Sequence, residues 1–168
     1  MKKIESIPQA SRTLQALSSL GYDLKSAVAD ILDNSIMAGA SEINVIAKAS
    51  SKWTIFFLDD GEGMSRSELT KAMNIGAHGE YQENDLGKFG MGLKTASLSQ
   101  CRLLTVISRN DHKGPACGFQ WNRDHVDKVN KWEIFELSAA EIEKHLKLAN
   151  ISAKQLGTIV IWDRLEIL

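Results

Sequence analysis

Three groups of residues in this sequence have types and spacings that could carry out chemistry. The first is the segment DLGKFGMGLKTAS, in which Gly87, Gly90 and Gly92 stand just before and at the start of an expected helix. Glycines at a helix start let backbone amides approach an anion such as a phosphate at the positive end of the helix. Their order is G-x-x-G-x-G, not that of a dinucleotide fingerprint, and Leu93 separates Gly92 from Lys94, which excludes a Walker A loop. The alternative is glycines that serve only a turn and helix packing.

The second group is centred on an aspartate at the end of an apolar run. Asp59 directly follows the apolar run Trp53–Leu58, which is expected to form a strand. By strand alternation its side chain shares a face with every second residue of that run. Burying an ionised carboxylate there costs free energy unless a fixed hydrogen-bond donor satisfies it, and the exocyclic amine of a ligand is such a donor. Gly61 and Gly63 follow and would let a flat ring lie close. The alternative is a polar turn built from aspartate and glycine.

The third group is Asp30 and Asn34, four residues apart and therefore one turn apart on one helix face. A carboxylate beside an amide oxygen suits the activation of water next to a hard cation. Mg²⁺ prefers oxygen ligands and keeps waters and phosphates in its shell, so a single protein oxygen from Asn34 can suffice. The alternative is a solvated helix face.

Hydrophobic periodicity predicts the elements that must position these groups. The polar, glycine-rich stretch 75–89 predicts a long loop, which in a compact domain is typical of a lid or binding loop. Strands that follow one another between helices favour an α+β fold, a two-layer sandwich of a mostly antiparallel sheet with helices on one face. The expected helices are Pro8–Leu20, Asp23–Ala38, Ser65–Asn74, Gly90–Gln100 and Ser138–Asn150, and the expected strands are Glu42–Lys48, Trp53–Leu58, Arg102–Ser108, Gly118–Asn122, Trp132–Leu137 and Thr158–Trp162.

Composition excludes several classes of protein. The 168 residues carry a net charge of −1 without a linker or repeat, which predicts one domain over residues 1–168 and no autonomous binding of nucleic acid. Cys101 and Cys117 have no paired spacing, which favours a reducing, cytoplasmic compartment over a disulfide scaffold. The sequence contains no apolar run long enough for a membrane span, so no membrane association is expected.

The order of four motifs resembles the GHKL ATPase superfamily. DILDNSIMAGA, LDDGEGM, DLGKFGMGLKTAS and GTIVIWD follow one another as the ATP-binding motifs do in that superfamily, which includes gyrase-type topoisomerases, the heat-shock ninety chaperone, histidine kinases and MutL. The form here is most similar to MORC-like and MutL-like members. The resemblance implies the Bergerat ATP-binding fold, with ATP and Mg²⁺ as cofactors.

The resemblance also implies a role for each matching residue, with Asp30 as the catalytic residue that positions the attacking water. Asp59 would accept from the adenine amino group, and the loop from Ile75 to Phe89 would be the ATP lid. Lys94 would contact a phosphate, the alternative being a surface ion pair. The remaining nucleotide contacts implied are Gly61, Gly63 and Met64 along the base, Thr158 at the adenine edge, Asn34 on Mg²⁺, and the amides of Gly87, Gly90 and Gly92 on the phosphates.

The implied function is slow, Mg²⁺-dependent ATP hydrolysis, in which lid closure and an ATP-dependent homodimer drive an attached effector. Asp30 stands where hydrolytic members usually carry glutamate, and its side chain is one methylene shorter. A nucleotide-gated assembly module with little hydrolysis is therefore the alternative, while the acidic residue argues against a histidine kinase. The chain is expected to be the ATP-binding domain of a longer multidomain protein, since no transducer domain with its phosphate-binding lysine follows.

Overall fold

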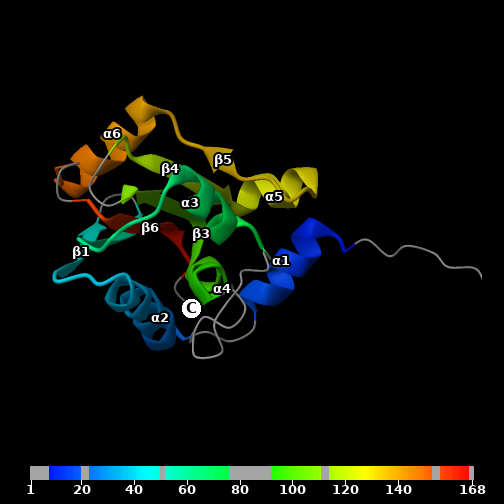
Figure 1. Ribbon diagram of the computed structural model, residues 1–168. Coiled ribbons are helices and arrows are strands. Elements are labelled where there is room, and N and C mark those ends of the chain that lie inside the picture. Colours follow the sequence, from blue (N-terminus) through cyan, green and yellow to red (C-terminus); the bar gives the residue numbers. More distant parts are fainter. Residues whose placement is uncertain are drawn as a thin grey trace, which may run out of the picture.

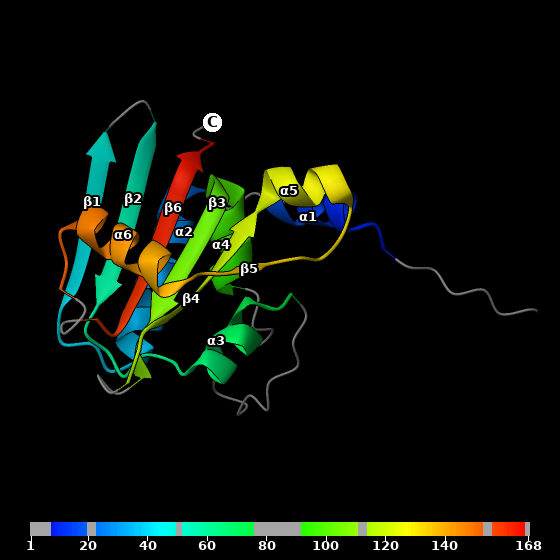
Figure 2. The same ribbon diagram turned by 90° about the horizontal axis from the view of Figure 1, so that it is seen from above.

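In the computed structural model, the parts of the chain that the structure describes are residues 8–19, 23–49, 52–75, 92–110, 114–152 and 156–166. They form one six-stranded sheet in which each neighbouring pair of strands is antiparallel, with helices on both faces (Figures 1 and 2). The strands lie in the order β1-β2-β6-β3-β4-β5, so the last strand of the chain is in the middle of the sheet. The helices are α1 (Ala10–Ser18), α2 (Leu24–Met37), α3 (Arg66–Met73), α4 (Gly92–Gln100), α5 (Arg123–Val129) and α6 (Ala139–Ala149), and the strands are β1 (Ile43–Ala49), β2 (Trp53–Asp59), β3 (Cys101–Ser108), β4 (Cys117–Asn122), β5 (Phe135–Glu136) and β6 (Thr158–Leu165).

Local sequence signals start several of these helices where the sequence predicts. The Asp23 side chain accepts from the Ser26 amide at the N-terminus of α2. Ser65 and Ser138 form capping boxes with Glu68 and Glu141 at the starts of α3 and α6. A cap of this kind satisfies amides that have no partner inside the helix and contributes about 1 kcal/mol.

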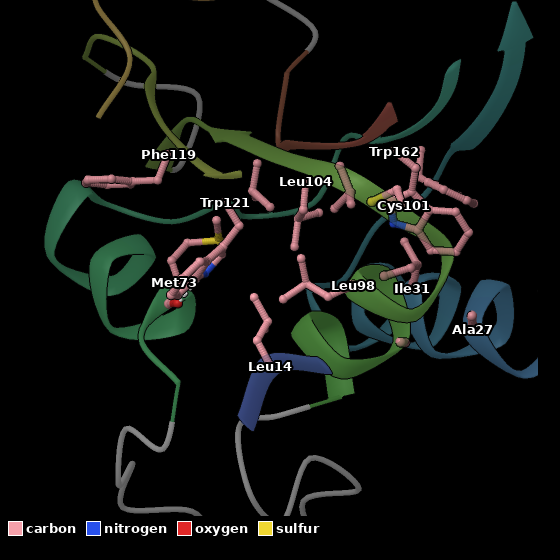
Figure 3. Close-up of a cluster of buried hydrophobic side chains, with 14 of the residues drawn as sticks. Leu14, Ala27, Ile31, Met73, Leu98, Cys101, Leu104, Phe119, Trp121 and Trp162 are labelled. Atoms are coloured by element: carbon pink, nitrogen blue, oxygen red, sulfur yellow. Dashed lines mark hydrogen bonds between the residues drawn. The ribbon is translucent and has the colours of Figure 1, made fainter. Parts of the chain in front are cut away.

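Strand alternation divides the core into two layers, one on each face of the sheet. On the face covered by α1, α2 and α4, Phe57 and Trp162 meet edge to face with ring centroids 4.6 Å apart, and the cluster extends to Leu104 and Leu98 (Figure 3). On the other face, Phe56 belongs to a second cluster that is completed by side chains of α6. Each layer is therefore built from every second residue of the strands.

The predicted α+β class is confirmed, with one refinement and two differences of detail. Helix α6 packs on the face opposite α2 and α4, so the helices are not confined to one face (Figure 2). The expected strand Trp132–Leu137 is reduced to Phe135–Glu136. Helix α5 follows β4 without a predicted counterpart, and its N-cap is the Asn122 side chain, which accepts from the His125 amide.

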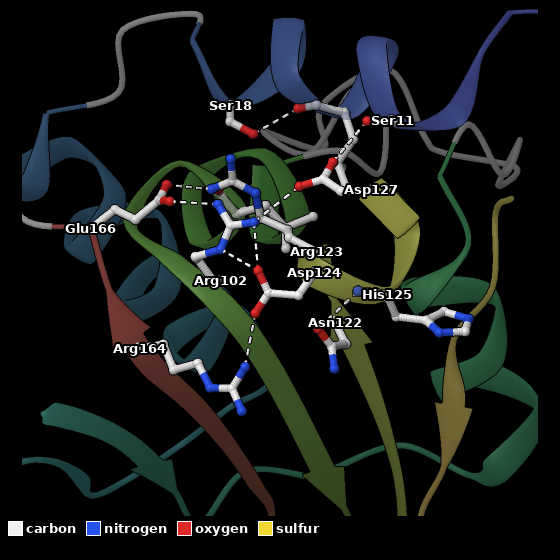
Figure 4. Close-up of polar contacts among 12 residues, drawn as sticks. Ser11, Ser18, Arg102, Asn122, Arg123, Asp124, His125, Asp127, Arg164 and Glu166 are labelled. Atoms are coloured by element: carbon white, nitrogen blue, oxygen red, sulfur yellow. Dashed lines mark hydrogen bonds and ion pairs between the residues drawn. The ribbon is translucent and has the colours of Figure 1, made fainter. Parts of the chain in front are cut away.

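An ion-pair network ties the start of β3 to the end of β6. Arg102 contacts Asp124, Asp127 and Glu166, while Arg123 contacts the other oxygen of Glu166 (Figure 4). Because Ser108 pairs with Thr158 at the opposite ends of β3 and β6, this network stabilises the end of the sheet remote from Asp59. No helix in the described part of the chain is long and apolar enough to cross a membrane.

Candidate functional site

Asp59 is the last residue of β2, and its carboxylate is held by donors from three separate segments. Its Oδ1 accepts from the amides of Gly61 at 3.0 Å and Thr158 at 3.1 Å. Its Oδ2 accepts from the Ser35 hydroxyl of α2 at 2.8 Å. The residue is only 5% exposed, so the carboxylate is a buried acceptor in a fixed orientation.

The electrostatics of Asp59 follow from a competition between burial and hydrogen bonding. Burial is the larger effect and raises the pKa of the Asp59 carboxyl above its ordinary value, while the hydrogen bonds from Ser35, Gly61 and Thr158 act to lower it. A carboxylate has about four lone-pair sites, and these donors occupy three. A further donor, such as an exocyclic amine, would both fill the remaining site and stabilise the charged form.

Glycines beside Asp59 allow three backbone segments to approach one another closely. A Cβ at Gly157 would lie 2.4 Å from the Gly61 carbonyl oxygen, and one at Gly61 would lie 2.8 Å from the Ala38 carbonyl oxygen. Gly63 has φ +68°, and a Cβ there would lie 2.2 Å from the Arg109 carbonyl oxygen. Real Cβ atoms do not occupy such positions, so these glycines are required by backbone packing whether or not a ring lies against them.

Ser108 at the end of β3 connects the loop after β2 to β6. Its hydroxyl oxygen accepts from the Met64 amide at 2.7 Å, and its proton is donated to the Gly157 carbonyl at 3.0 Å. The Thr158 hydroxyl lies 2.8 Å from the same Ser108 oxygen. Because a hydroxyl has one proton, Thr158 is the donor in that contact whenever Ser108 donates to Gly157, and the Thr158 oxygen then keeps a lone pair as an acceptor.

Asp30 faces the start of α4. A Cβ placed on Gly92, the first residue of α4, would lie 3.8 Å from Asp30 Oδ2. Asp30 is half-buried and Asn34, one turn further along α2, is exposed. The structure thus brings an acidic side chain of α2 to the helix end at which an anion binds most readily.

Lys94, in the first turns of α4, is buried rather than placed in the surface ion pair considered as an alternative. The residue is 2% exposed, and its Nζ donates to the Asn74 carbonyl at 2.6 Å. Burial lowers the pKa of Lys94 to about 8. The Trp121 indole donates to the neighbouring Met73 carbonyl at 2.9 Å, so α4 and β4 together hold the C-terminal end of α3. The predicted contact of Lys94 with a phosphate stays a prediction.

Part of the predicted site lies outside the described residues. Gly87, Gly90 and the predicted lid from residue 76 onward belong to that part. Within the described residues, no group of three or more His, Cys, Asp or Glu side chains could hold a metal ion. The oxygens of Asn34 and Asp30 do suit Mg²⁺, because this ion accepts few protein ligands when phosphates and waters complete its shell.

The structure also reveals site residues that the sequence did not single out, namely Ser35, Ser108 and Gly157. Ser35 lies on the otherwise apolar stripe of α2, and a buried polar residue in such a stripe is a signal that it has a fixed partner. Ser108 is a polar residue at the end of a mostly apolar strand, β3, just as Asp59 is at the end of β2. Gly157 stands directly before Thr158, where a close approach of backbones requires it.

These features define the class of protein. The sheet is antiparallel, a buried aspartate ends one of its strands beside a glycine-rich turn, and an aspartate of α2 faces the start of α4. This arrangement is a nucleotide-binding fold of the Bergerat type. A family model described as "Histidine kinase-, DNA gyrase B-, and HSP90-like ATPase" matches residues 22–158. The chain belongs to this GHKL ATPase family.

Relatives with curated descriptions place it near MutL and MORC proteins. The DNA mismatch repair protein MutL of Thermosipho africanus is 28% identical over 146 residues, which cover 81% of this chain and 24% of that protein. Protein MICRORCHIDIA 2 of Arabidopsis thaliana is 32% identical over 95 residues, or 52% of this chain and 15% of the relative. The MutL of Phenylobacterium zucineum is 33% identical over 93 residues, covering 50% of this chain and 15% of that protein. The chain thus spans a quarter or less of the length of these relatives.

Proposed function

We propose that the chain binds ATP with Mg²⁺ and hydrolyses it slowly, and that the nucleotide closes the segment 75–89 and drives formation of a homodimer. The observation that carries the proposal is the position of the Asp30 carboxylate, which faces Gly92 at the start of α4. A helix N-terminus is a binding site for phosphate, and a carboxylate next to it is placed to orient a water for attack. The four motifs and the family match support the same assignment.

In the proposed site, the buried aspartate selects the base. Asp59 accepts a hydrogen bond from the adenine amino group through its remaining lone pair, and Thr158 offers its hydroxyl oxygen at the adenine edge. Gly61, Gly63 and Met64 form the turn against which the ring lies. A base with a carbonyl group at the position of that amine would direct an acceptor at Asp59, so the site would select adenine over guanine.

The phosphates occupy the start of α4 in this proposal. The amides of Gly87, Gly90 and Gly92 and the ammonium group of Lys94 hold them, and Asn34 is the protein ligand of Mg²⁺, which neutralises phosphate charge when bound. Asp30 accepts a hydrogen bond from the attacking water and takes up its proton. The cycle of binding and hydrolysis is coupled to an effector, as the resemblance to MutL-like and MORC-like members implies.

A second candidate function is a nucleotide-gated assembly module with little hydrolysis. It is favoured by the short side chain of Asp30, which reaches one methylene less far than the glutamate of hydrolytic members. The two functions share the binding site and differ only in turnover. Rapid, saturable phosphate release that depends on Asp30 would reject the second.

Calorimetric titration with ATP and Mg²⁺ tests the binding site. We expect Asp59→Asn to weaken binding by about 10- to 100-fold, because a hydrogen bond to a charged group contributes about 1.5–3 kcal/mol. Asp60→Asn is the matched control, because Asp60 accepts from Ser41 and from the Glu42 amide, away from the proposed base. Equal affinity of the wild type and Asp59→Asn would overturn the assignment of adenine to Asp59.

A further inference from the structure

Strand β1 has an outer edge that no other described strand covers. It ends the sheet order, and among the described strands it pairs with β2 alone, over the full length Ile43–Ala49 (Figure 2). An uncovered edge presents a row of amides and carbonyls on which another strand can pair. The feature is separate from the proposed nucleotide site, to which β1 contributes no residue.

The register identifies the backbone groups that point outward. The Asp60 amide donates to the Glu42 carbonyl, one step beyond the pair Ile43 and Asp59. Bonded and non-bonded pairs alternate along an antiparallel ladder, so every second residue of β1 directs its amide and carbonyl away from β2. The direction of the Asp59 carbonyl supports this alternation, because it accepts from the Gly157 amide on the β6 side and therefore points away from β1. The outward residues are Ile43, Val45, Ala47 and Ala49.

The edge lacks the charges that usually prevent pairing. Lys48 is the only charged residue of β1, and its amino group donates to the Leu148 carbonyl at the end of α6, so it is directed onto its own chain. Val45 and Trp53 are each 52% exposed, and both lie on the α2 side of the sheet. The surface beside the edge is therefore apolar and contains no proline.

We propose that β1 pairs with β1 of a second copy of this chain, antiparallel about a two-fold axis at Ile46. This register places Val45 opposite the partner's Ala47, and Ile43 opposite the partner's Ala49. Every outward residue is then used, and each such pair exchanges two backbone hydrogen bonds. A two-fold, self-complementary contact is the commonest symmetry of homo-oligomers.

Side-chain sizes and charges fit this register. The small Ala49 lies between Trp53 of its own sheet and the partner's Ile43, so the exposed indole covers the partner's edge. Lys48 lies opposite the partner's Asn44, and like charges do not meet. The net charge of −1 adds little repulsion between two copies.

Sedimentation of the chain over a concentration series, without nucleotide, tests the dimer. Ala47→Pro removes an outward amide that takes no part in the bonds to β2, and we expect it to weaken the dimer by at least about tenfold, since two symmetric hydrogen bonds are lost. Ala47→Ser retains the amide and is expected to dimerise like the wild type. A wild type that is monomeric at the highest concentration, or an Ala47→Pro variant that dimerises equally well, overturns the proposal.

A cysteine cross-link tests the register without relying on the fold of the proline variant. Opposite residues of a non-bonded pair have Cα atoms about 4.5 Å apart, which a disulfide can span. Ile46→Cys, with Cys117→Ser and with Cys101 buried, should form a covalent dimer on oxidation. Asn44→Cys in the same background should not, because the partner's Lys48 faces it. No cross-link at position 46, or equal cross-linking at both positions, overturns the register.

These experiments are independent of the proposed function. The β1 dimer forms without nucleotide, whereas the homodimer of the proposed function requires ATP. Loss of ATP binding in calorimetry with an intact β1 dimer would contradict the proposed function alone, and a monomer that binds ATP would contradict the β1 dimer alone.

Discussion

The two ends of the candidate site differ in how the protein holds them. At the proposed adenine end, Asp59 is 5% exposed, and amides and a hydroxyl from three segments fix both of its carboxylate oxygens. At the proposed phosphate end, Asn34 is exposed and Asp30 is half-buried. The carboxylate proposed to recognise the base is therefore fixed by the folded chain alone, whereas Asp30 and Asn34 are side chains that the nucleotide and Mg²⁺ would organise.

The largest effect is expected at the phosphate end. Asp30→Asn should lower the rate of phosphate release by about 10²- to 10⁴-fold, because it removes the proposed general base, while the affinity for ATP changes little. Steady-state kinetics together with calorimetry separate these quantities. Asp33→Asn, on an exposed part of α2, is the control. Equal turnover in the wild type and Asp30→Asn would leave the assembly module as the better account.

The buried amine of Lys94 should make stability depend on pH. Burial lowers the pKa of Lys94 to about 8 from 10.5, so the folded state disfavours the charged form. The destabilisation is fully present below pH 8 and is lost as the pH rises to 10.5. The wild type should therefore gain about 3 kcal/mol relative to Lys94→Met over that window, as measured by denaturant unfolding. Parallel pH profiles of the two proteins would contradict the burial of the amine.

Two glycines with the same backbone conformation test how tightly the turn after Asp59 is packed. Gly63 and Gly39 have φ values of +68° and +70°, but only at Gly63 would a Cβ meet another atom, the Arg109 carbonyl oxygen at 2.2 Å. Gly63→Ala should destabilise the fold by about 1–3 kcal/mol more than Gly39→Ala. Both variants place a Cβ on a left-handed backbone, but only the methyl group at position 63 also overlaps a neighbouring backbone atom. Denaturant unfolding measures the difference, and equal destabilisation would show that the loop at Gly63 yields.

The smallest effect is expected from Ser35, which orients Asp59 rather than contacting the nucleotide. Ser35→Ala removes the hydrogen bond to Oδ2 and should weaken ATP binding by about fivefold, in line with about 1 kcal/mol for such a bond. Calorimetry measures this, and Ser35→Thr, which keeps a hydroxyl, should restore part of the affinity. A full loss of binding in Ser35→Ala would mean that Ser35 contacts the nucleotide itself.

Much of the fold could be predicted because its signals are local. The capping boxes at Ser65 and Ser138 and the alternation in β1 and β2 each depend on residues within one turn or a few strand positions. The missed helix α5 is short, and its signal is the Asn122 cap, which the preceding strand pattern obscured. The strand predicted over Trp132–Leu137 is longer than the observed strand Phe135–Glu136. Two residues are too few to establish an alternation from which the strand ends could be predicted.

By itself, the sequence determined the family, the fold class and the candidate residues Asp30, Asn34 and Asp59, since the order and spacing of motifs are properties of the chain. The contacts of those residues were decided by the tertiary structure. The Ser35 hydroxyl reaches Asp59 across 24 positions, the Thr158 amide reaches it across 99, and Asp30 meets Gly92 through the packing of α2 beside α4. Such contacts depend on which strands become neighbours in the sheet, and β6 pairs along one edge with β2 and along the other with β3. The alternation within a strand specifies which residues share a face, but it does not specify which strands, remote in the sequence, will lie on either side.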